Sequence, residues 1–312
     1  MALGGAPLAG LFTPVGEDAA RATVDAAWEA GIRTFDTAPH YGVGLSERRI
    51  GAALRERPRD DYTLITKVGR LIVPRGEPGA QRADEFAESA DREEVRDYSA
   101  DGVRRSLERS LERLGLDRVD VLLVHDPDAP EQLDQAIAEA FPALVELREQ
   151  GVIGAVGAGM NYPEPLARIV READVDALLA AGQLTMLDQR GLEELAPLCE
   201  ERGVAIFAAG VFNSGILADP KPGATFFYEP ASEDLVKRAQ RMREVAARRG
   251  LPLTAVAMAY ALRQPAVESV VIGARSVEEV RDNAAAFALP VPGEIWGELV
   301  DEGLLPGAAA PA

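Results

Sequence analysis

Cysteine, lysine and histidine are scarce in this sequence. Cys199 is the single cysteine, which excludes an internal disulfide framework and a cluster of thiolate metal ligands. It lies in a helical-looking stretch, where we expect a small buried apolar residue. No apolar run approaches the roughly 20 residues that cross a bilayer. No lysine or arginine precedes Arg21, so the basic start of a signal peptide is missing. These absences predict a soluble, cytoplasmic protein.

Positive charge is also in short supply. The formal net charge is −18, whereas nucleic acids and anionic membrane surfaces bind clustered positive charge. We therefore expect neither a nucleic-acid partner nor a membrane partner, and interpret the acidity as a source of solubility. Histidine, cysteine and carboxylate residues do not follow the spacing of a metal site. The remaining expectation is a protein that acts on a small molecule, as a monomer or a weak homo-oligomer.

Short apolar runs alternate with longer amphipathic stretches along the whole chain. The expected strands are Leu8–Phe12, Arg33–Thr37, Thr63–Lys67, Val119–His125, Ile153–Gly159, Ala177–Gln183, Val204–Gly210 and Ser269–Gly273. The expected helices include Glu17–Ala30, Ser46–Arg57, Ala100–Leu114, Gln132–Gln150, Gly191–Arg202 and Val277–Phe287. This alternation is typical of βαβ units around a parallel sheet. It favours an α/β fold, a single (β/α)₈ TIM barrel spanning residues 1–312. An open doubly wound sheet is the alternative, but no glycine-rich nucleotide loop follows the first run.

Two connections are too long to be plain links. Val68–Ser99 follows the third expected strand, and Val211–Ser232 follows the seventh. Both leave the carboxyl ends of strands, where barrel enzymes build their active sites. We expect them to cover a substrate and a cofactor; ordered surface excursions are the alternative.

Four polar residues stand at or just beyond the ends of neighbouring strands. Asp36 ends the second strand and Tyr41 follows it, Lys67 ends the third, and His125 ends the fourth. Adjacent parallel strands lie about 4.8 Å apart, so these side chains can converge. Each residue alone has an ordinary structural interpretation, such as an ion-pair partner, a turn cap or a packing residue. Their joint placement is what indicates a catalytic site.

The four side chains make chemical sense together. A free tyrosine titrates near pH ~10, which makes it a weak acid for carbonyl chemistry at neutral pH. We expect Lys67 to stabilise the phenolate of Tyr41 and lower its pKa, with Asp36 holding Lys67 charged. His125 would orient the substrate oxygen or share its proton. Tyr41 could then give a proton to a carbonyl, or take one from a hydroxyl, as hydride moves at carbon.

In order and spacing, these residues resemble the aldo-keto reductase family. Its Asp/Tyr/Lys/His tetrad is matched by Asp36-Thr-Ala-Pro-His-Tyr41-Gly, Ile65-Thr66-Lys67 and Leu123-Val124-His125. Further matching segments, from Leu8 to Phe287, include Ser46-Glu47-Arg-Arg-Ile-Gly, Arg105-Ser106-Leu107, Gly151-Val-Ile-Gly, Asn213-Ser214-Gly215-Ile-Leu and Val270-Val271-Ile272-Gly273. The resemblance implies an oxidoreductase that moves hydride between a nicotinamide cofactor and a carbonyl or sugar, with the four residues as its catalytic tetrad.

The same resemblance implies a cofactor site. Gln183 should bind the nicotinamide carboxamide, and Asn161 is a second candidate for that contact. The tyrosine that often stacks on nicotinamide is replaced by Ala209 or Gly210, which leaves either Phe212 over the ring or no stacking. The remaining expected contacts are Asn213, Gly215 and Leu217 at the pyrophosphate, and Gly273, Arg275, Glu279 and Asn283 at the adenosine end.

Glu279 falls where many NADP-using members of that family carry a basic residue. A carboxylate there would repel the adenosine 2′-phosphate and accept hydrogen bonds from a free 2′-hydroxyl, so we expect NAD to be preferred over NADP. Arg275 and Arg281 lie close in sequence, and either could turn toward a phosphate instead. A solvated Glu279 without a cofactor contact is the plainer interpretation.

The substrate is less defined by the sequence. Asp97-Tyr98-Ser99-Ala-Asp101-Gly102 and His125-Asp126-Pro127 look most like bacterial sugar dehydrogenases acting on fucose- or threo-aldose-type sugars, and like the related pyridoxal dehydrogenase. We therefore expect oxidation of a sugar at its anomeric carbon. Asp126 is expected either to bind a sugar hydroxyl or to begin the turn at Pro127, and His40 to be structural or a pocket wall.

Three other functions are kept as alternatives. A general aldehyde or pyridoxal oxidoreductase would use the same residues. A Schiff-base lyase would use Lys67, although Asp36 would favour the charged amine over the neutral nucleophile. A non-catalytic nicotinamide-binding protein is the third, because a fold does not determine a function.

Overall fold

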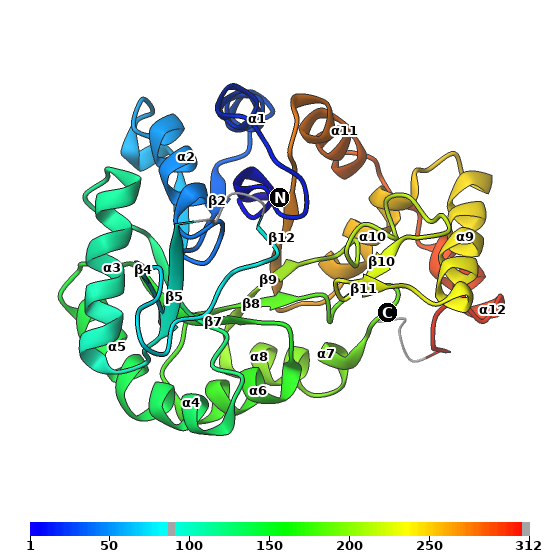
Figure 1. The fold of residues 1–312 in the computed structure, drawn as a ribbon. Coiled ribbons are helices and arrows are strands. Elements are labelled where there is room, and N and C mark those ends of the chain that lie inside the picture. The colour runs from blue at the N-terminus through cyan, green and yellow to red at the C-terminus, as the bar shows by residue number, and fades with distance from the viewer. Residues whose placement is uncertain (87–90, 308–312) are drawn as a thin grey trace.

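A closed barrel of parallel strands forms the centre of the molecule (Figure 1). The computed structural model describes residues 1–86 and 91–307. The barrel strands, in spatial order, are β1 (Ala2–Gly4), β12 (Val267–Gly273), β9 (Ala205–Ala209), β8 (Ala177–Ala181), β7 (Ala155–Met160), β6 (Val121–His125), β3 (Thr63–Val68) and β2 (Thr34–Asp36). Pairing of Leu3 with Ile272 and with Phe35 closes the ring between β12 and β2. The predicted single (β/α)₈ barrel is therefore confirmed.

Helices surround the strands (Figure 1). They are α1 (Glu17–Glu29), α2 (Leu45–Leu54), α3 (Ala100–Leu114), α4 (Pro130–Gln135), α5 (Phe141–Glu149), α6 (Pro163–Glu172), α7 (Arg190–Glu193), α8 (Leu195–Arg202), α9 (Glu233–Arg248), α10 (Leu253–Leu262), α11 (Val277–Phe287) and α12 (Glu294–Asp301). A π-helical turn, Ala136–Ala140, joins α4 to α5 within the expected helix. In the described part of the chain, no helix has both the length and the apolar character that a membrane span requires.

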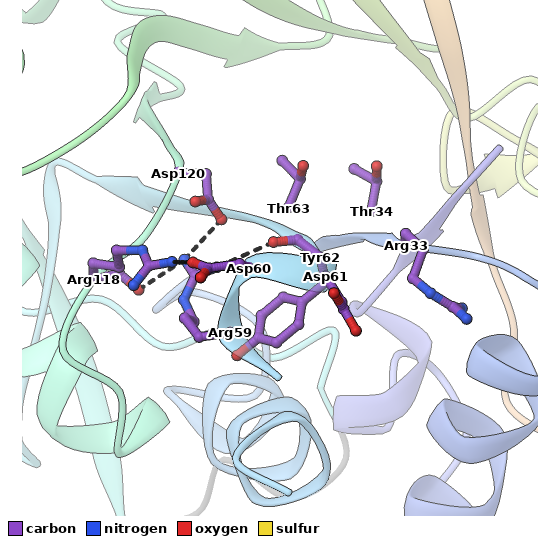
Figure 2. Close-up of a pocket in the computed structure, with 9 residues that line it drawn as sticks. All are labelled: Arg33, Thr34, Arg59, Asp60, Asp61, Tyr62, Thr63, Arg118 and Asp120. Atoms are coloured by element: carbon purple, nitrogen blue, oxygen red, sulfur yellow. Dashed lines mark hydrogen bonds and ion pairs between the residues drawn. The ribbon is translucent and has the colours of Figure 1, made fainter. Parts of the chain in front are cut away.

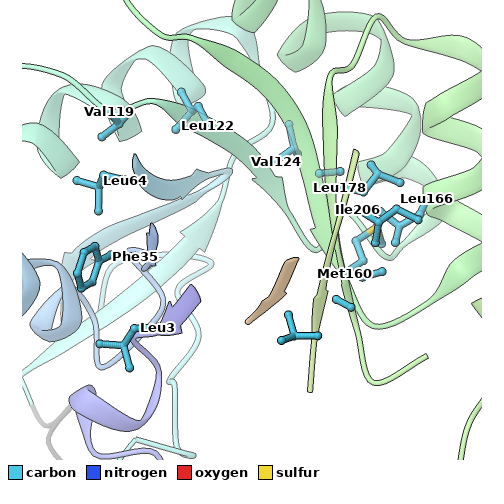
Figure 3. Close-up of a cluster of buried hydrophobic side chains, with 14 of the residues drawn as sticks. Leu3, Phe35, Leu64, Val119, Leu122, Val124, Met160, Leu166, Leu178 and Ile206 are labelled. Carbon is cyan, nitrogen blue, oxygen red and sulfur yellow. The ribbon is translucent and has the colours of Figure 1, made fainter. Parts of the chain in front are cut away.

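Side chains of the barrel strands alternate between two cores. Leu64, Leu122 and Val124 point outward and pack beneath the helices in the larger core (Figure 3). Ile65 and Leu123, one position along, fill the inside of the barrel. This period of two is what a strand in a closed barrel requires, since alternate residues face opposite sides.

The first barrel strand is not the expected one. Leu8–Phe12 contains the end of a short 3₁₀ helix, Pro7–Ala9, and β1 lies earlier in the chain. Pro7 has a fixed φ and no N–H, and Gly10 takes a left-handed φ of 79°, so the backbone turns here instead of extending. The prediction of a strand at Leu8–Phe12 was wrong because this apolar run packs as a turn.

The two long connections follow β3 and β9, as expected. The first contains an antiparallel hairpin of β4 (Arg70–Pro74) and β5 (Arg92–Arg96). The second contains β10 (Thr225–Phe226) and β11 (Glu229–Pro230). Each connection ends at a serine that caps the next helix, Ser99 for α3 and Ser232 for α9.

The turn of the second hairpin is unusual. Phe227 and Tyr228 occupy its two central positions, with left-handed φ values of 49° and 66°. Two-residue hairpin turns of this kind favour Asn-Gly, because residues with a Cβ are strained there. Strain of this sort often accompanies a functional site, which directs attention to what these side chains contact.

Candidate active site

The alternation inside the barrel brings three polar side chains to its carboxyl end. Lys67 follows Ile65 on the inward face of β3, and His125 follows Leu123 on that of β6. Asp36 ends β2 next to the outward-facing Phe35. The inward positions therefore change from apolar to ionisable where the strands end, which is the face used by barrel enzymes.

Lys67 and Asp36 form a buried ion pair. Lys67 Nζ lies 2.6 Å from Asp36 Oδ1 and donates a second hydrogen bond, 2.9 Å long, to the Thr37 carbonyl. Only 1% of the Lys67 side chain is exposed, so its charge depends on this partner. Burial raises the pKa of Asp36, and the charge of Lys67 opposes that shift.

Tyr41 lies beside this pair in the loop between β2 and α2. Lys67 Nζ is 4.7 Å from the centre of the Tyr41 ring. The ring of His125 meets it edge-on, with the two centroids 5.9 Å apart. All four residues of the expected tetrad are thus brought together.

Tyr41 is a neutral phenol in this structure. Burial raises its pKa well above the ordinary value, and the charges of Asp36 and Tyr228 raise it further. Burial thus outweighs the lowering expected from Lys67, whose ammonium is paired with Asp36. Tyr41 therefore keeps its proton at neutral pH and can give it to a substrate, and Lys67 is placed to stabilise the phenolate left behind.

His125 is a neutral imidazole. Burial lowers its pKa well below the ordinary value, followed by the positive charges of Arg70 and Lys67. Its Nε2 lies 3.5 Å from Asp126 Oδ2. Its Nδ1 is buried and has no hydrogen-bond partner among the described residues. A neutral ring with an uncommitted nitrogen can orient a substrate oxygen without competing for the proton of Tyr41.

Several site residues are absent from the sequence-based expectations. Arg70 and Glu94, on the two strands of the β4–β5 hairpin, and Glu85 lie close to His40 and Asp126. Their signal in the sequence is weak, because only the pairing of β4 with β5 brings them to one place. Asp126 itself takes a left-handed φ of 46°, and its Oδ2 lies 3.5 Å from His125 Nε2.

Tyr228 is another unexpected member. Its hydroxyl oxygen accepts a hydrogen bond from the Asn161 side-chain amide. Burial raises the pKa of Tyr228, and this bond opposes the rise. Its ring lies 5.9 Å from that of Phe12, which also has a left-handed φ, of 61°. The turn of the β10–β11 hairpin therefore reaches over the mouth of the barrel to the end of β7.

The expected nicotinamide contacts offer suitable free atoms. Gln183 is fully buried; its Nε2 donates to the Met160 carbonyl, while Oε1 has no partner in the described part of the chain. Asn213 Nδ2 donates to the Gly182 carbonyl, and its buried Oδ1 is likewise unpartnered there. Buried acceptors without partners are costly, so these atoms fit the amide and hydroxyl donors of a nicotinamide nucleotide.

The other expected cofactor residues of the loop after β9 lie in different environments. Phe212 is partly buried against both larger cores, and Gly215 takes a left-handed φ of 97° in the same loop. Leu217 is fully buried in a core, and its N–H donates to the Phe212 carbonyl, which gives it a packing role.

The expected adenosine contacts lie after β12. Gly273 ends that strand, and a Cβ there would come within 2.7 Å of the Pro7 side chain. Arg275 Nε lies 3.3 Å from Glu279 Oε1, and the Arg275 N–H donates to Glu279 Oε2. Asn283 follows four residues later on the same helix, α11.

A large cavity lies at the opposite end of the barrel. It has a volume of about 340 Å³ and is lined by residues that precede or begin β2, β3 and β6 (Figure 2). Arg59 pairs with Asp120 at 2.7 Å, and Arg118 pairs with Asp60. Because the arginines face aspartates and none of the tetrad is near, this cavity is a structural feature of the amino-terminal end.

Comparison with known proteins agrees with the geometry. The model of the aldo/keto reductase family matches residues 1–301. The chain is 41% identical over 308 residues to D-threo-aldose 1-dehydrogenase of Pseudomonas sp., covering 97% of this chain and 93% of the relative. It is 39% identical over 322 residues to pyridoxal 4-dehydrogenase of Microbacterium luteolum, covering 98% and 94%. The holo form of an aldo-keto reductase from Bacillus halodurans has a TM-score of 0.78 at 27% identity, covering 100% of this chain and 93% of that one. The chain therefore belongs to the aldo/keto reductase family and is an NAD(P)-dependent oxidoreductase.

Proposed function

We propose that the protein is an aldose 1-dehydrogenase, acting on fucose- or threo-aldose-type sugars at the anomeric carbon and using Asp36, Tyr41, Lys67 and His125. The observation that carries the proposal is the convergence of these four side chains around one space, with the ammonium of Lys67 4.7 Å from the Tyr41 ring. The similarity to D-threo-aldose 1-dehydrogenase supports the substrate class.

The chemistry of each side chain follows from its protonation. When bound, the nicotinamide supplies the carbon that accepts or returns hydride. Tyr41 moves the proton: it donates to the carbonyl oxygen in reduction and, as the phenolate, accepts the hydroxyl proton in oxidation. Lys67 stabilises that phenolate, and Asp36 keeps Lys67 charged and aimed. Because burial raises the pKa of Tyr41, sugar oxidation should accelerate as the pH rises.

A polar group next to His125 supports a hydroxylated substrate. Asp126 Oδ2 lies 3.5 Å from His125 Nε2 and 2.7 Å from Arg70 Nη2. A substrate oxygen held by His125 therefore brings a neighbouring hydroxyl within reach of this carboxylate, which accepts hydrogen bonds strongly. A simple aliphatic aldehyde would offer it no donor beyond Arg70.

The cofactor proposal uses Gln183 and Asn161 at the nicotinamide carboxamide and Phe212 over its ring. It places Asn213, Gly215 and Leu217 along the pyrophosphate, and Gly273, Arg275, Glu279 and Asn283 at the adenosine. We propose NAD as the preferred cofactor. The ion pair between Arg275 and Glu279 supports this, because a 2′-phosphate near Glu279 would meet a carboxylate and an arginine that is already paired.

A substrate screen tests the proposal. The absorbance of reduced cofactor should change with aldoses in preference to pyridoxal and simple aldehydes, and the product should be a lactone. Oxidation elsewhere on the sugar, or activity confined to simple aldehydes, would refute the substrate assignment while leaving the family unchanged.

Pyridoxal oxidation is the second candidate. A flat aromatic substrate would find rings near the catalytic tyrosine, since Phe86 lies 6.1 Å from Tyr41 and 5.3 Å from His40 between centroids. The similarity to pyridoxal 4-dehydrogenase points the same way. In the same screen, faster turnover of pyridoxal than of any aldose would favour it.

The remaining alternatives are less well supported. A Schiff-base lyase needs a neutral Lys67, whereas Asp36 and the Thr37 carbonyl both bind its ammonium. Borohydride trapping of substrate on Lys67 would revive that alternative, and tight cofactor binding without turnover would revive a non-catalytic role. A cytoplasmic location and a monomeric or weakly oligomeric state belong to the proposal too, with cell fractionation and sedimentation as their tests.

A further inference from the structure

A chain of charged and ionisable side chains, most of them buried, lies beside the catalytic residues. His40 Nε2 lies 2.8 Å from Glu85 Oε1, and His40 Nδ1 lies 2.8 Å from Glu94 Oε2. Arg70 then joins the other oxygen of Glu94, at 2.5 Å, to Asp126, at 2.7 Å. The chain ends beside His125, whose Nε2 is 3.5 Å from Asp126. Apart from His125, none of these residues belongs to the tetrad.

The positions of its members are informative. His40 immediately precedes Tyr41, and Asp126 immediately follows His125. Arg70 and Glu94 lie on the paired strands β4 and β5. Through these two side chains, the β4–β5 hairpin thus holds His40 and Asp126. They are the sequence neighbours of Tyr41 and His125, which are proposed to handle the substrate oxygen and its proton.

Each of these side chains contacts at least one group of opposite charge. Burial alone would lower the pKa of His40, but its bonds to Glu85 and Glu94 outweigh burial and raise it. Burial would raise the pKa of Glu94, but His40 and Arg70 lower it. A carboxylate lies at each nitrogen of His40 and favours the imidazolium, whereas Arg70 Nη1, 3.2 Å from Nδ1, opposes it. These bonds are complete at low pH and weaken as the pH rises through the raised pKa of His40.

Arg70 is central to this chain because its guanidinium binds the carboxylate of Asp126. Without that guanidinium, the carboxylate of Asp126 would turn to its remaining neighbour, His125, favour the imidazolium and draw the ring away from the substrate. Four positive charges lower the pKa of His125: Arg70, Lys67, His40 and Arg96. The ring of Tyr41 and the carboxylate of Asp126 also lie beside the imidazole. Of those four cations, Arg70 has the largest effect.

We infer that Arg70 is a positioning residue for the proton-transfer pair. By joining Asp126 to Glu94, and through Glu94 to His40, it fixes the loop that carries Tyr41 against the strand end that carries His125. It also leaves His125 neutral and free for the substrate oxygen. The inference rests on the proposed roles of Tyr41 and His125, and adds a function for the hairpin after β3 beyond covering the pocket.

The two histidines allow a direct test. Nitrogen-15 spectra of the cofactor-free protein give one imidazole titration for each, and His40→Gln assigns them. In the unmodified protein, His40 should titrate above its ordinary value and His125 should stay neutral well below it. In Arg70→Met the pKa of His125 should rise by about one unit or more, because a nearby cation is removed and Asp126 is released. An unmoved His125 titration would overturn the inference.

Kinetics provide the second readout. Arg70→Met should lower kcat for aldehyde reduction by roughly tenfold to a hundredfold, as small misplacements of reacting groups do. The acid limb of its pH–rate profile should move to higher pH together with the His125 titration, and the Kd of the cofactor should be unchanged. Arg70→Lys, which keeps a charge, should recover part of the shift. A displaced titration without any change in kcat would also overturn the inference.

Arg109→Met is the matched control. Arg109 on α3 donates to the Ile72 carbonyl at 3.2 Å, so it holds the same strand, β4, without entering the chain of charges. This variant should leave the His125 titration and the acid limb unchanged; a matching shift would mean that hairpin stability, not Arg70, is responsible. If Arg70→Met does not fold, Arg70→Met/Glu94→Gln removes the stranded carboxylate and carries the same test. Failure of the proposed function is seen separately, as a Tyr41→Phe variant that retains turnover.

Discussion

The two ends of the barrel both carry ion pairs, but in different settings. At the amino-terminal end, Arg59 and Arg118 pair with Asp120 and Asp60 around an open cavity (Figure 2). At the carboxyl end, Lys67 and Asp36 are almost entirely buried, as is the bond between Arg70 and Glu94. The first set ties strand ends together, while the second surrounds a tyrosine and a histidine whose pKa values are shifted strongly.

This difference shows how burial changes what a charge can do. An exposed pair is worth little, because water screens it and competes for both partners. A buried pair costs desolvation and gives little net stability. Because water screens it less, it shifts the pKa of nearby groups more strongly. The catalytic end therefore uses its charges to set protonation, and the opposite end uses them to hold strands.

The largest effect is expected from the catalytic tyrosine. Tyr41→Phe keeps the ring and removes the proton donor, so turnover should fall by roughly 10²–10⁴. Cofactor affinity, measured by fluorescence quenching, should barely change. Near-native turnover under conditions where hydride transfer limits the rate would show that the carboxyl end does not use Tyr41 as proposed.

The choice between NAD and NADP tests whether the charges after β12 also act on a bound ligand at the carboxyl end of the barrel. Unit like charges ~4 Å apart cost about 1 kcal/mol in water and about 4 kcal/mol at an effective dielectric of 20. The ratio of kcat/KM for NAD to that for NADP should therefore lie between roughly ten and a thousand. Glu279→Arg should reverse or abolish this preference. Equal use of NADP by the parent enzyme would contradict the assignment of Glu279.

Lys67 tests the electrostatic contribution to proton transfer. Lys67→Met removes the ammonium beside Tyr41, so the phenolate becomes harder to form and the pH–rate profile for sugar oxidation should move further alkaline. A shift of one unit corresponds to about tenfold in rate at a fixed lower pH. Since Asp36 would be left buried and unpaired, Lys67→Met/Asp36→Asn is the matched variant for stability. An unchanged profile, with chemistry limiting, would make Lys67 a structural residue.

The smallest catalytic effect is expected at the opposite end. Arg59 donates to Asp120 and to the carbonyls of Tyr62 and Arg118. Arg59→Met should lower the free energy of unfolding by about 1 kcal/mol, the usual net contribution of a hydrogen-bonded ion pair that is partly open to water. Its kcat/KM should equal that of the parent enzyme. A loss of activity in the folded variant would break the division of roles between the two ends.

The sequence predicted the catalytic tetrad because each member directly ends or follows an apolar strand. Asp36, Lys67 and His125 need only the period of two and the barrel geometry to converge. The first strand could not be predicted, since Ala2–Gly4 is short and made of residues without strong β preference. Arg70 and Glu94 lie 24 positions apart in the sequence, and only the pairing of β4 with β5 reveals their proximity. Tyr228 depends on a strained turn that no local signal indicates.

The strained turn at Phe227 and Tyr228 lowers the stability of the protein but shapes the entrance to the barrel. Left-handed backbone costs about 1–2 kcal/mol for each residue with a Cβ, and Asn-Gly would relax both Phe227 and Tyr228. The same exchange would remove the ring that meets Phe12 and the hydroxyl that reaches Asn161. Selection for heat resistance alone would therefore favour this exchange and uncover the entrance to the barrel. Directed evolution of this enzyme needs turnover and stability screened together.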